Sequence, residues 1–145
     1  AFLVLLPAFL GVAGALGGIL SSRLSTHFHL GLDDASPLPS RATLREARAV
    51  GAAALPVFML SALLAEWASV ATYQSTPGLS DLLTATLLAG VVATVLVAVV
   101  AYATTMAAFR LGLDPDTYGI PMVLSVLDLG GAFTLILAMV AVGAA

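Results

Sequence analysis

The chain has 145 residues, of which 61% are hydrophobic and only 9% are charged, and its mean hydropathy is +1.11. An ordinary soluble domain has about 25% charged residues, so the composition excludes one and indicates lipid as the main solvent. The net charge is −3, all five basic residues are Arg, and Cys is absent, which argues against a nucleic-acid partner, a disulfide framework and a thiolate metal site.

Long uncharged stretches divide the chain into four predicted spans. Residues 1–22 and 82–109 carry no charge, whereas 49–80 and 117–145 carry one acid each. These stretches are much longer than the alternating segments of a barrel strand, and a transmembrane helix needs about 20 apolar residues. The predicted helices cover roughly 1–25, 46–72, 80–109 and 117–142. Residues 1–145 are therefore expected to form a single all-α integral membrane domain, a helical bundle.

The first predicted span is rich in small residues. Gly11, Gly14 and Gly18 recur at helical spacing on one face, and Ser21 follows them. Such a face allows helices to approach closely, which is the simpler interpretation. The functional interpretation is that Gly11, Gly14, Gly18 and Ser21 line a pore, where exposed carbonyl groups and water can meet an ion.

The second predicted span follows a loop at 30–45 and contains one acid. Thr43 and Glu46 have the spacing of a capping box, which predicts a helix start there. Glu66 lies toward the far end of this span, beside Trp67. Because Trp marks the membrane interface, Glu66 is either an interfacial acid that reaches water or a weak candidate for a cation ligand at the outer mouth.

The arginines predict the orientation of the bundle. Four flank the first loop, one flanks the third, and none flanks the second, at 73–80. They are Arg23, Arg41, Arg45, Arg48 and Arg110. The positive-inside rule places the first and third loops in the cytoplasm and both ends of this chain outside. An additional helix before Ala1 would resolve the outside N-terminus, so we expect five spans in the full protein.

The last span follows the turn Asp114-Pro115-Asp116. Asp114 is a natural N-cap and Pro115 suits the first helical position, although Asp114 and Asp116 are also weak candidates for ligands at an inner cation mouth. Asp128 lies near the middle of this span, where a carboxylate costs about 2.5–3.5 kcal/mol on insertion scales. The arginines lie at or beyond the ends of the predicted spans, so the chain offers no intramembrane Lys or Arg to pair with it. Asp128 is therefore the primary candidate for a cation or proton site.

The neighbours of Asp128 suit a pore wall. Ser125 and Ala132 lie three residues before it and four residues after it, on the same helical face. We expect both to line the pore. Motifs for phosphate binding and for hydrolytic catalysis are absent from the sequence, so an enzyme is not expected.

Two segments resemble the MgtE-type divalent-cation transporters. Residues 7–26, PAFLGVAGALGGILSSRLST, resemble the second transmembrane helix of the family, closest to archaeal members and related eukaryotic solute carriers. Residues 112–130, GLDPDTYGIPMVLSVLDLG, resemble the start of its fifth helix, with an Asp-Pro turn before an intramembrane Asp. Many members have Asn where this chain has Ala15. The resemblance extends over nearly the whole chain.

The resemblance implies a five-helix domain that works as a homodimer. Its magnesium pore would follow the two-fold axis, and the Asp of the last helix, Asp128 here, would bind the hydrated cation. Mg²⁺ keeps several waters and is usually held by one or two carboxylates, which suits one Asp128 from each subunit. We therefore expect a multi-pass protein of the cell membrane whose partners are Mg²⁺ or a similar divalent cation, the lipid bilayer and a second copy of the chain.

Two other functions remain open from the residues alone. A proton-coupled transporter of another solute could use Asp128 as its proton carrier. A membrane assembly subunit without transport activity could use its glycine faces only for packing. Cation uptake that depends on Asp128 distinguishes transport from assembly, and pH coupling distinguishes proton exchange from passage of a cation.

Overall fold

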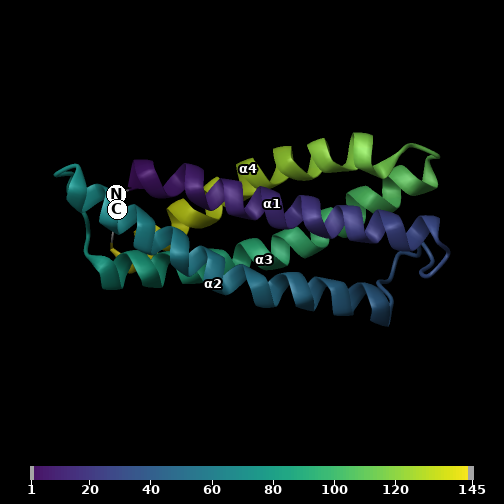
Figure 1. Cartoon of the computed structure of the whole chain (residues 1–145), viewed down its shortest axis with the longest axis horizontal. Helices are drawn as coiled ribbons and strands as arrows, with labels where there is room; N and C mark the ends of the chain where they lie inside the picture. The colour runs from purple at the N-terminus through teal and green to yellow at the C-terminus, as the bar shows by residue number, and fades with distance from the viewer. Residues whose placement is uncertain (1, 144–145) are drawn as a thin grey trace.

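The computed structural model describes residues 2–143, which form four long helices joined by short connections (Figure 1). In chain order these elements are α1 (Phe2–His29), α2 (Arg41–Ala71), α3 (Leu79–Arg110), the π-helical turn η1 (Pro115–Gly119) and α4 (Ile120–Val142). With η1 counted as part of the last span, four helices are long and apolar enough to cross a membrane. The predicted all-helical architecture with four membrane-capable helices is confirmed.

The helices extend beyond the uncharged stretches that predicted them. α1 continues to His29 and α2 already begins at Arg41, although the charges placed the limits near residues 25 and 46. A helix satisfies its own backbone hydrogen bonds in any solvent, so its ends need not coincide with the edge of the hydrocarbon core. Hydropathy therefore predicts which part of each helix crosses the hydrocarbon core, but it does not predict the residue at which the helix begins or ends.

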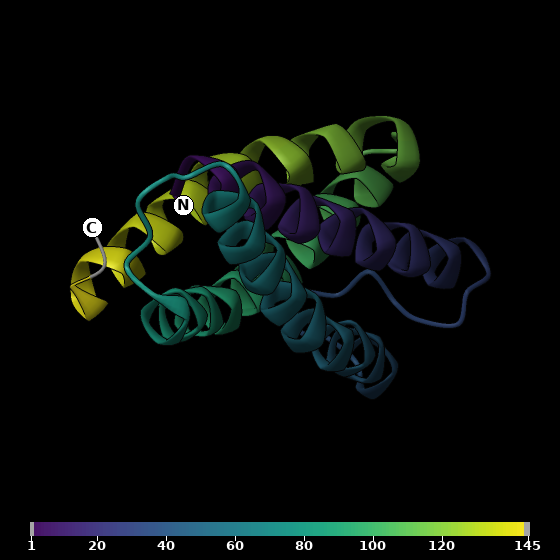
Figure 2. The same ribbon diagram turned by 60° about the vertical axis from the view of Figure 1, so that its left-hand side comes forward.

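α1 and α3 form the centre of the bundle, and α2 and α4 flank them. Contacts join α1 and α3 to each other and to both flanking helices, whereas α2 and α4 do not touch within residues 2–143. The α1–α2 loop and the connection from α3 to η1 lie at one end of the bundle. The α2–α3 turn lies at the other end, with the start of α1 and the end of α4 (Figures 1 and 2).

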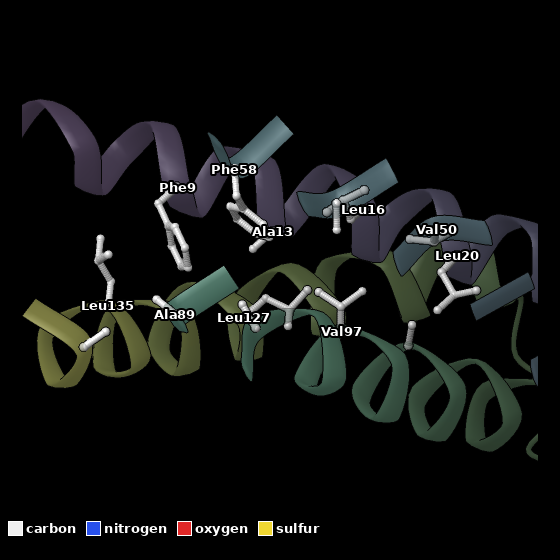
Figure 3. Packing of buried hydrophobic residues seen from close by; sticks show 14 of the residues in the cluster. Phe9, Ala13, Leu16, Leu20, Val50, Phe58, Ala89, Val97, Leu127 and Leu135 are labelled. Atoms are coloured by element: carbon white, nitrogen blue, oxygen red, sulfur yellow. The ribbon is translucent and has the colours of Figure 1, made fainter. Parts of the chain in front are cut away.

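Small residues and a few aromatic rings fill the interior. The ring centroids of Phe9 and Phe58 lie 4.7 Å apart. A Cβ atom added at Gly90 would lie 2.8 Å from Phe58 Cδ2, so α3 approaches α2 closely at a glycine. Figure 3 shows both rings among aliphatic side chains, with Ala13 and Ala89 nearby. Since lipid is as apolar as these side chains, van der Waals packing holds the helices together.

Ser40 caps α2, so the predicted capping box of Thr43 and Glu46 is wrong. The Ser40 hydroxyl accepts hydrogen bonds from two backbone N–H groups of the first turn, at 3.0 and 3.1 Å. Asp33 in the preceding loop accepts hydrogen bonds from the hydroxyls of Ser40 and Thr43, each at 2.5 Å. The helix start is therefore held by the loop, and Glu46 instead forms a 2.7 Å salt bridge with Arg23 of α1.

Two side chains of α3 fasten the α1–α2 loop to the bundle. The Tyr102 hydroxyl donates a hydrogen bond to the Ser36 carbonyl oxygen at 2.6 Å. Arg110 Nε donates to the Ala35 carbonyl oxygen, also at 2.6 Å. Both acceptors are backbone groups, so the contacts fix the path of the loop irrespective of its own side chains.

The predicted turn between the third and fourth spans is confirmed in its main features. α3 ends at Arg110, and Gly112 follows with φ +69°, a conformation that glycine adopts without strain. Asp114 is the N-cap of η1, and Pro115 occupies its first position. η1 is a π-helical turn, which the sequence did not indicate, and it leads directly into the helix that carries Asp128.

Candidate functional site

Asp128 lies on α4, midway along the 28-residue span Pro115–Val142. Its side chain is exposed on the surface of the single chain. No Lys or Arg occurs between residues 111 and 145, and the one salt bridge within residues 2–143 joins Arg23 to Glu46. Within residues 2–143 the structure therefore leaves this carboxylate without a basic partner midway along an apolar helix.

The α4 residues one turn before and one turn after Asp128 pack against α1, and these contacts show which part of α1 lies level with Asp128. A Cβ atom at Gly14 would lie 2.8 Å from Leu124 Cδ2, and one at Gly131 would lie 2.9 Å from Leu10 Cδ2. Leu124 and Gly131 are one turn before and one turn after Asp128, on the same side of α4. Asp128 is therefore level with the part of α1 between Leu10 and Gly14.

Gly11 occupies that part of α1 and is exposed. A Cβ atom added there would meet no other atom within 4 Å. The α1 backbone is accordingly uncovered at the depth of Asp128. An exposed carboxylate and an uncovered helix backbone lie at one level along the boundary between α1 and α4, where a hydrated cation could meet oxygen atoms of both.

The other predicted pore-lining residues differ in their exposure. Ser125, one turn before Asp128, is exposed and donates a hydrogen bond to the Pro121 carbonyl oxygen at 2.9 Å. Gly18 and Ala132 are half-buried, and Gly14 is buried against α4. The exposed and half-buried positions lie on α4, which carries Asp128, and on α1, which packs against it.

Ser21 lies inside the chain and not on its surface. Its hydroxyl forms a 2.7 Å hydrogen bond with the hydroxyl of Thr105 on α3, and both side chains are fully buried. A Cβ atom at Gly119 of η1 would lie 3.6 Å from Ser21 Oγ. The pair is thus packed beneath η1, and the sequence held no indication that Thr105 was its partner.

The Asp114 carboxylate is occupied by the cap of η1. It accepts hydrogen bonds from the Thr117 hydroxyl at 2.5 Å and from the Asp116 backbone N–H at 3.2 Å. These two hydrogen bonds lower the pKa of Asp114, with that from Thr117 the larger cause. The Asp116 side chain is exposed. Both acids lie at the same end of the bundle as the α1–α2 loop.

Glu66 ties the α2–α3 turn to α2. Its carboxylate accepts a hydrogen bond from the Thr76 hydroxyl, which in turn accepts one from the Gly78 backbone N–H at 3.0 Å. Glu66 is half-buried, and its neighbour Trp67 is 72% exposed. The structure places Glu66 at the opposite end of the bundle from Asp114 and Asp116.

The candidate ligands do not gather into one metal site within a single chain. Among residues 2–143, no group of three or more His, Asp or Glu side chains could hold a metal ion. Asp128, Glu66 and the Asp114–Asp116 turn occupy three separate levels along the bundle. A cation at Asp128 would have to keep water ligands or take oxygen atoms from another subunit.

Comparison with known protein families gives a match over most of the chain. The sequence model of the MgtE family, described as "Divalent cation transporter", matches residues 6–138. Neither the curated proteins nor the solved structures include a match. The matched range contains all four helices in whole or in large part, and it contains Asp128 and every other candidate site residue.

Proposed function

The chain belongs to the MgtE family of divalent cation transporters, and from this premise we propose that it carries Mg²⁺ or a similar divalent cation across the cell membrane with Asp128 as the intramembrane ligand. The family and the four apolar helices identify a multi-pass membrane protein that transports divalent cations. The observation that supports the site is the exposed Asp128 carboxylate, which lies midway along its span without a basic partner.

The ion would compensate for the cost of this carboxylate. An acid at the centre of a membrane is costly unless a partner, a proton or an ion accompanies it. When ionised it offers only acceptor oxygens, which hard divalent cations prefer. Mg²⁺ gives up its water reluctantly and is commonly held by one or two carboxylates, so a single acid per chain is sufficient if the site stays wet.

A second copy would complete the site. Asp128 and Gly11 are exposed on the flank formed by α1 and α4, and a two-fold axis beside that flank would bring two carboxylates together around one pore. Gly11, Ser125 and Ala132 would contribute to the wall, with Gly18 at its edge. Gly14 and Ser21 would lie behind the wall and hold its helices in place.

The roles of the remaining acids are weaker proposals. Asp114 and Asp116 would add negative charge at the inner mouth, and Glu66 would do so near the outer mouth. Each has a structural role or is freely exposed, so neutralising one of them would affect transport less than neutralising Asp128.

Substituting Asp128 tests the proposal. Asp128→Asn preserves the shape but removes a charge whose effect is larger in a low-dielectric pore than in water. We expect this variant to insert and assemble normally and to lose at least about tenfold of its Mg²⁺ uptake into vesicles, since 1.4 kcal/mol of lost ion stabilisation is sufficient for that. Asp128→Glu keeps the charge and should retain part of the uptake.

Asp34→Asn is the matched control, because Asp34 is an exposed loop acid and its loss changes the net charge equally. Its uptake should equal that of the unmodified protein. Unchanged uptake by Asp128→Asn would refute Asp128 as the cation site. Uptake that instead requires a proton gradient would support proton-coupled transport.

A further inference from the structure

Three arginines form a basic face at the start of α2. Arg41, Arg45 and Arg48 recur at a spacing of four and three residues, so they lie on one side of the helix, and all three are exposed. The other two arginines are engaged, Arg23 with Glu46 at 2.7 Å and Arg110 with a loop carbonyl. No acidic side chain within residues 2–143 forms a salt bridge with the three, so their guanidinium groups are free to bind an anion.

The basic face continues into the apolar, exposed side of α2. Ala52, Leu55, Met59 and Leu63 extend the same helical row and are all exposed. This flank is remote from Asp128, because α2 and α4 do not touch within the described residues. The row is therefore open on the surface of the chain along the span, and its three arginines continue it past the end of the apolar stretch.

The length of α2 places these arginines at the headgroups. α2 has 31 residues, about 46 Å at 1.5 Å per residue, whereas the hydrocarbon core is about 30 Å thick. The stretch 49–71 alone is long enough to cross that core and carries one charge, Glu66. The two turns that carry Arg41, Arg45 and Arg48 therefore lie in the headgroup layer.

We propose that Arg41, Arg45 and Arg48 bind the phosphate groups of anionic phospholipids. Guanidinium groups bind phosphate with paired hydrogen bonds, and anionic lipids are enriched in the cytoplasmic leaflet, where the arginines place this end of the bundle. Leu44 lies within the basic face and is 41% exposed, so the face presents an apolar side chain among its charges. The assignment is independent of any role of Asp128.

The test measures lipid binding to the purified protein in neutral detergent. Native mass spectrometry would give apparent affinities for phosphatidylglycerol and phosphatidylcholine. We expect a preference for phosphatidylglycerol that falls about fivefold with each arginine lost and about a hundredfold in R41Q/R45Q/R48Q, from a contribution of about 1 kcal/mol per residue. R41K/R45K/R48K should retain part of the preference, because the charges remain although the paired hydrogen bonds of the guanidinium groups are lost.

The paired variant R23Q/E46Q is the matched control. It removes one guanidinium and the acid that neutralises it at the same end of the bundle, so the preference should be unchanged. None of the three substituted guanidinium groups forms a salt bridge within residues 2–143, and helical circular dichroism should confirm that R41Q/R45Q/R48Q is folded.

Three results would overturn the assignment. In the first, the unmodified protein binds both lipids equally or R41Q/R45Q/R48Q keeps the preference. In the second, millimolar inorganic phosphate displaces phosphatidylglycerol, which would identify a site for a soluble anion. In the third, R41Q/R45Q/R48Q dissociates a dimer without a change in lipid affinity, which would assign the face to a second copy of the chain.

Discussion

Individual glycines of α1 have different surroundings although they look alike in the sequence. A Cβ atom at Gly17 would lie 2.5 Å from Leu127 Cδ1 and 2.6 Å from Val123 Cγ1, whereas one at Gly11 would meet nothing within 4 Å. The first glycine permits the contact between α1 and α4. The second leaves the α1 backbone uncovered at the level of Asp128.

Leucine substitutions should separate these two roles. Gly17→Leu inserts a side chain where two others already lie, so we expect the monomer to lose about 3 kcal/mol or more, the upper range for overpacking. Gly11→Leu should leave the free energy of unfolding of the monomer almost unchanged, because its side chain extends into open space. Unfolding in mixed detergent would measure both, and equal losses would contradict this packing of α1 against α4.

Asp33 gives the loop end of the bundle a pH dependence. Burial alone would raise its pKa, but hydrogen bonds from the side chains of Ser40 and Thr43 lower it overall. A lowered folded pKa means that the ionised form stabilises the fold. This stabilisation is fully present above the unfolded value near 3.9 and is lost as the pH falls through the lower folded value.

Asp33→Asn should therefore be less stable than the unmodified protein at pH 6, and the difference should shrink below about pH 4. Thermal unfolding in detergent across this pH range would measure it. Other acids titrate in both proteins, so the difference isolates Asp33. A gap that is constant or widens on acidification would show that the carboxylate does not hold the start of α2.

At the scale of the elements, α3 holds the α1–α2 loop in place through a hydrogen bond to the loop and a ring contact with the end of α1. Tyr102 donates to the Ser36 carbonyl oxygen, and the ring of Tyr102 lies 6.3 Å from that of Phe28. Removing the hydroxyl deletes the hydrogen bond and leaves the ring contact in place. The loop path therefore depends on a helix that is remote in the sequence.

Tyr102→Phe should loosen this loop without disturbing the helices. A hydrogen bond of this kind contributes about 0.5–1.5 kcal/mol, so amide exchange over residues 31–39 should accelerate up to about tenfold. Thr104→Val is the control, because its hydroxyl bonds only within α3. Unchanged exchange in Tyr102→Phe would mean that other contacts determine the loop path.

At the scale of the whole molecule, the two flanks of the bundle differ. The α4 flank carries Asp128 and Ser125, and the α2 flank carries exposed apolar side chains such as Met59. The proposed two-fold pore requires a second copy beside the first flank and lipid beside the second. Cross-linking can distinguish the flanks, since the chain has no Cys of its own.

Ser125→Cys should give a covalent dimer with a short bifunctional maleimide in membranes, because the proposed axis brings the two α4 helices together. Met59→Cys, on a helix that does not touch α4 in the chain, should remain monomeric under the same treatment. Gel electrophoresis under denaturing conditions would measure both. Cross-linking at Met59 alone would place the subunit interface on the wrong flank for a shared site at Asp128.

The sequence by itself determined the solvent, the number of membrane-capable helices and the acid at mid-depth. Long uncharged stretches can be read directly from the sequence. Whether a helix can cross a bilayer depends mainly on the length and polarity of such a stretch. The position of Asp128 within its span follows from the same count. The row of Arg41, Arg45 and Arg48 could also have been found from its helical spacing.

Only the tertiary structure decided which of these residues face each other. Gly14 is buried and Gly11 is open because α4 contacts one edge of α1 and not the other. Ser40 displaces Thr43 as the cap of α2 because Asp33, brought there by the loop, accepts hydrogen bonds from both. Helix spacing defines faces, but the partner of each face depends on packing between segments far apart in the chain, which no local pattern encodes.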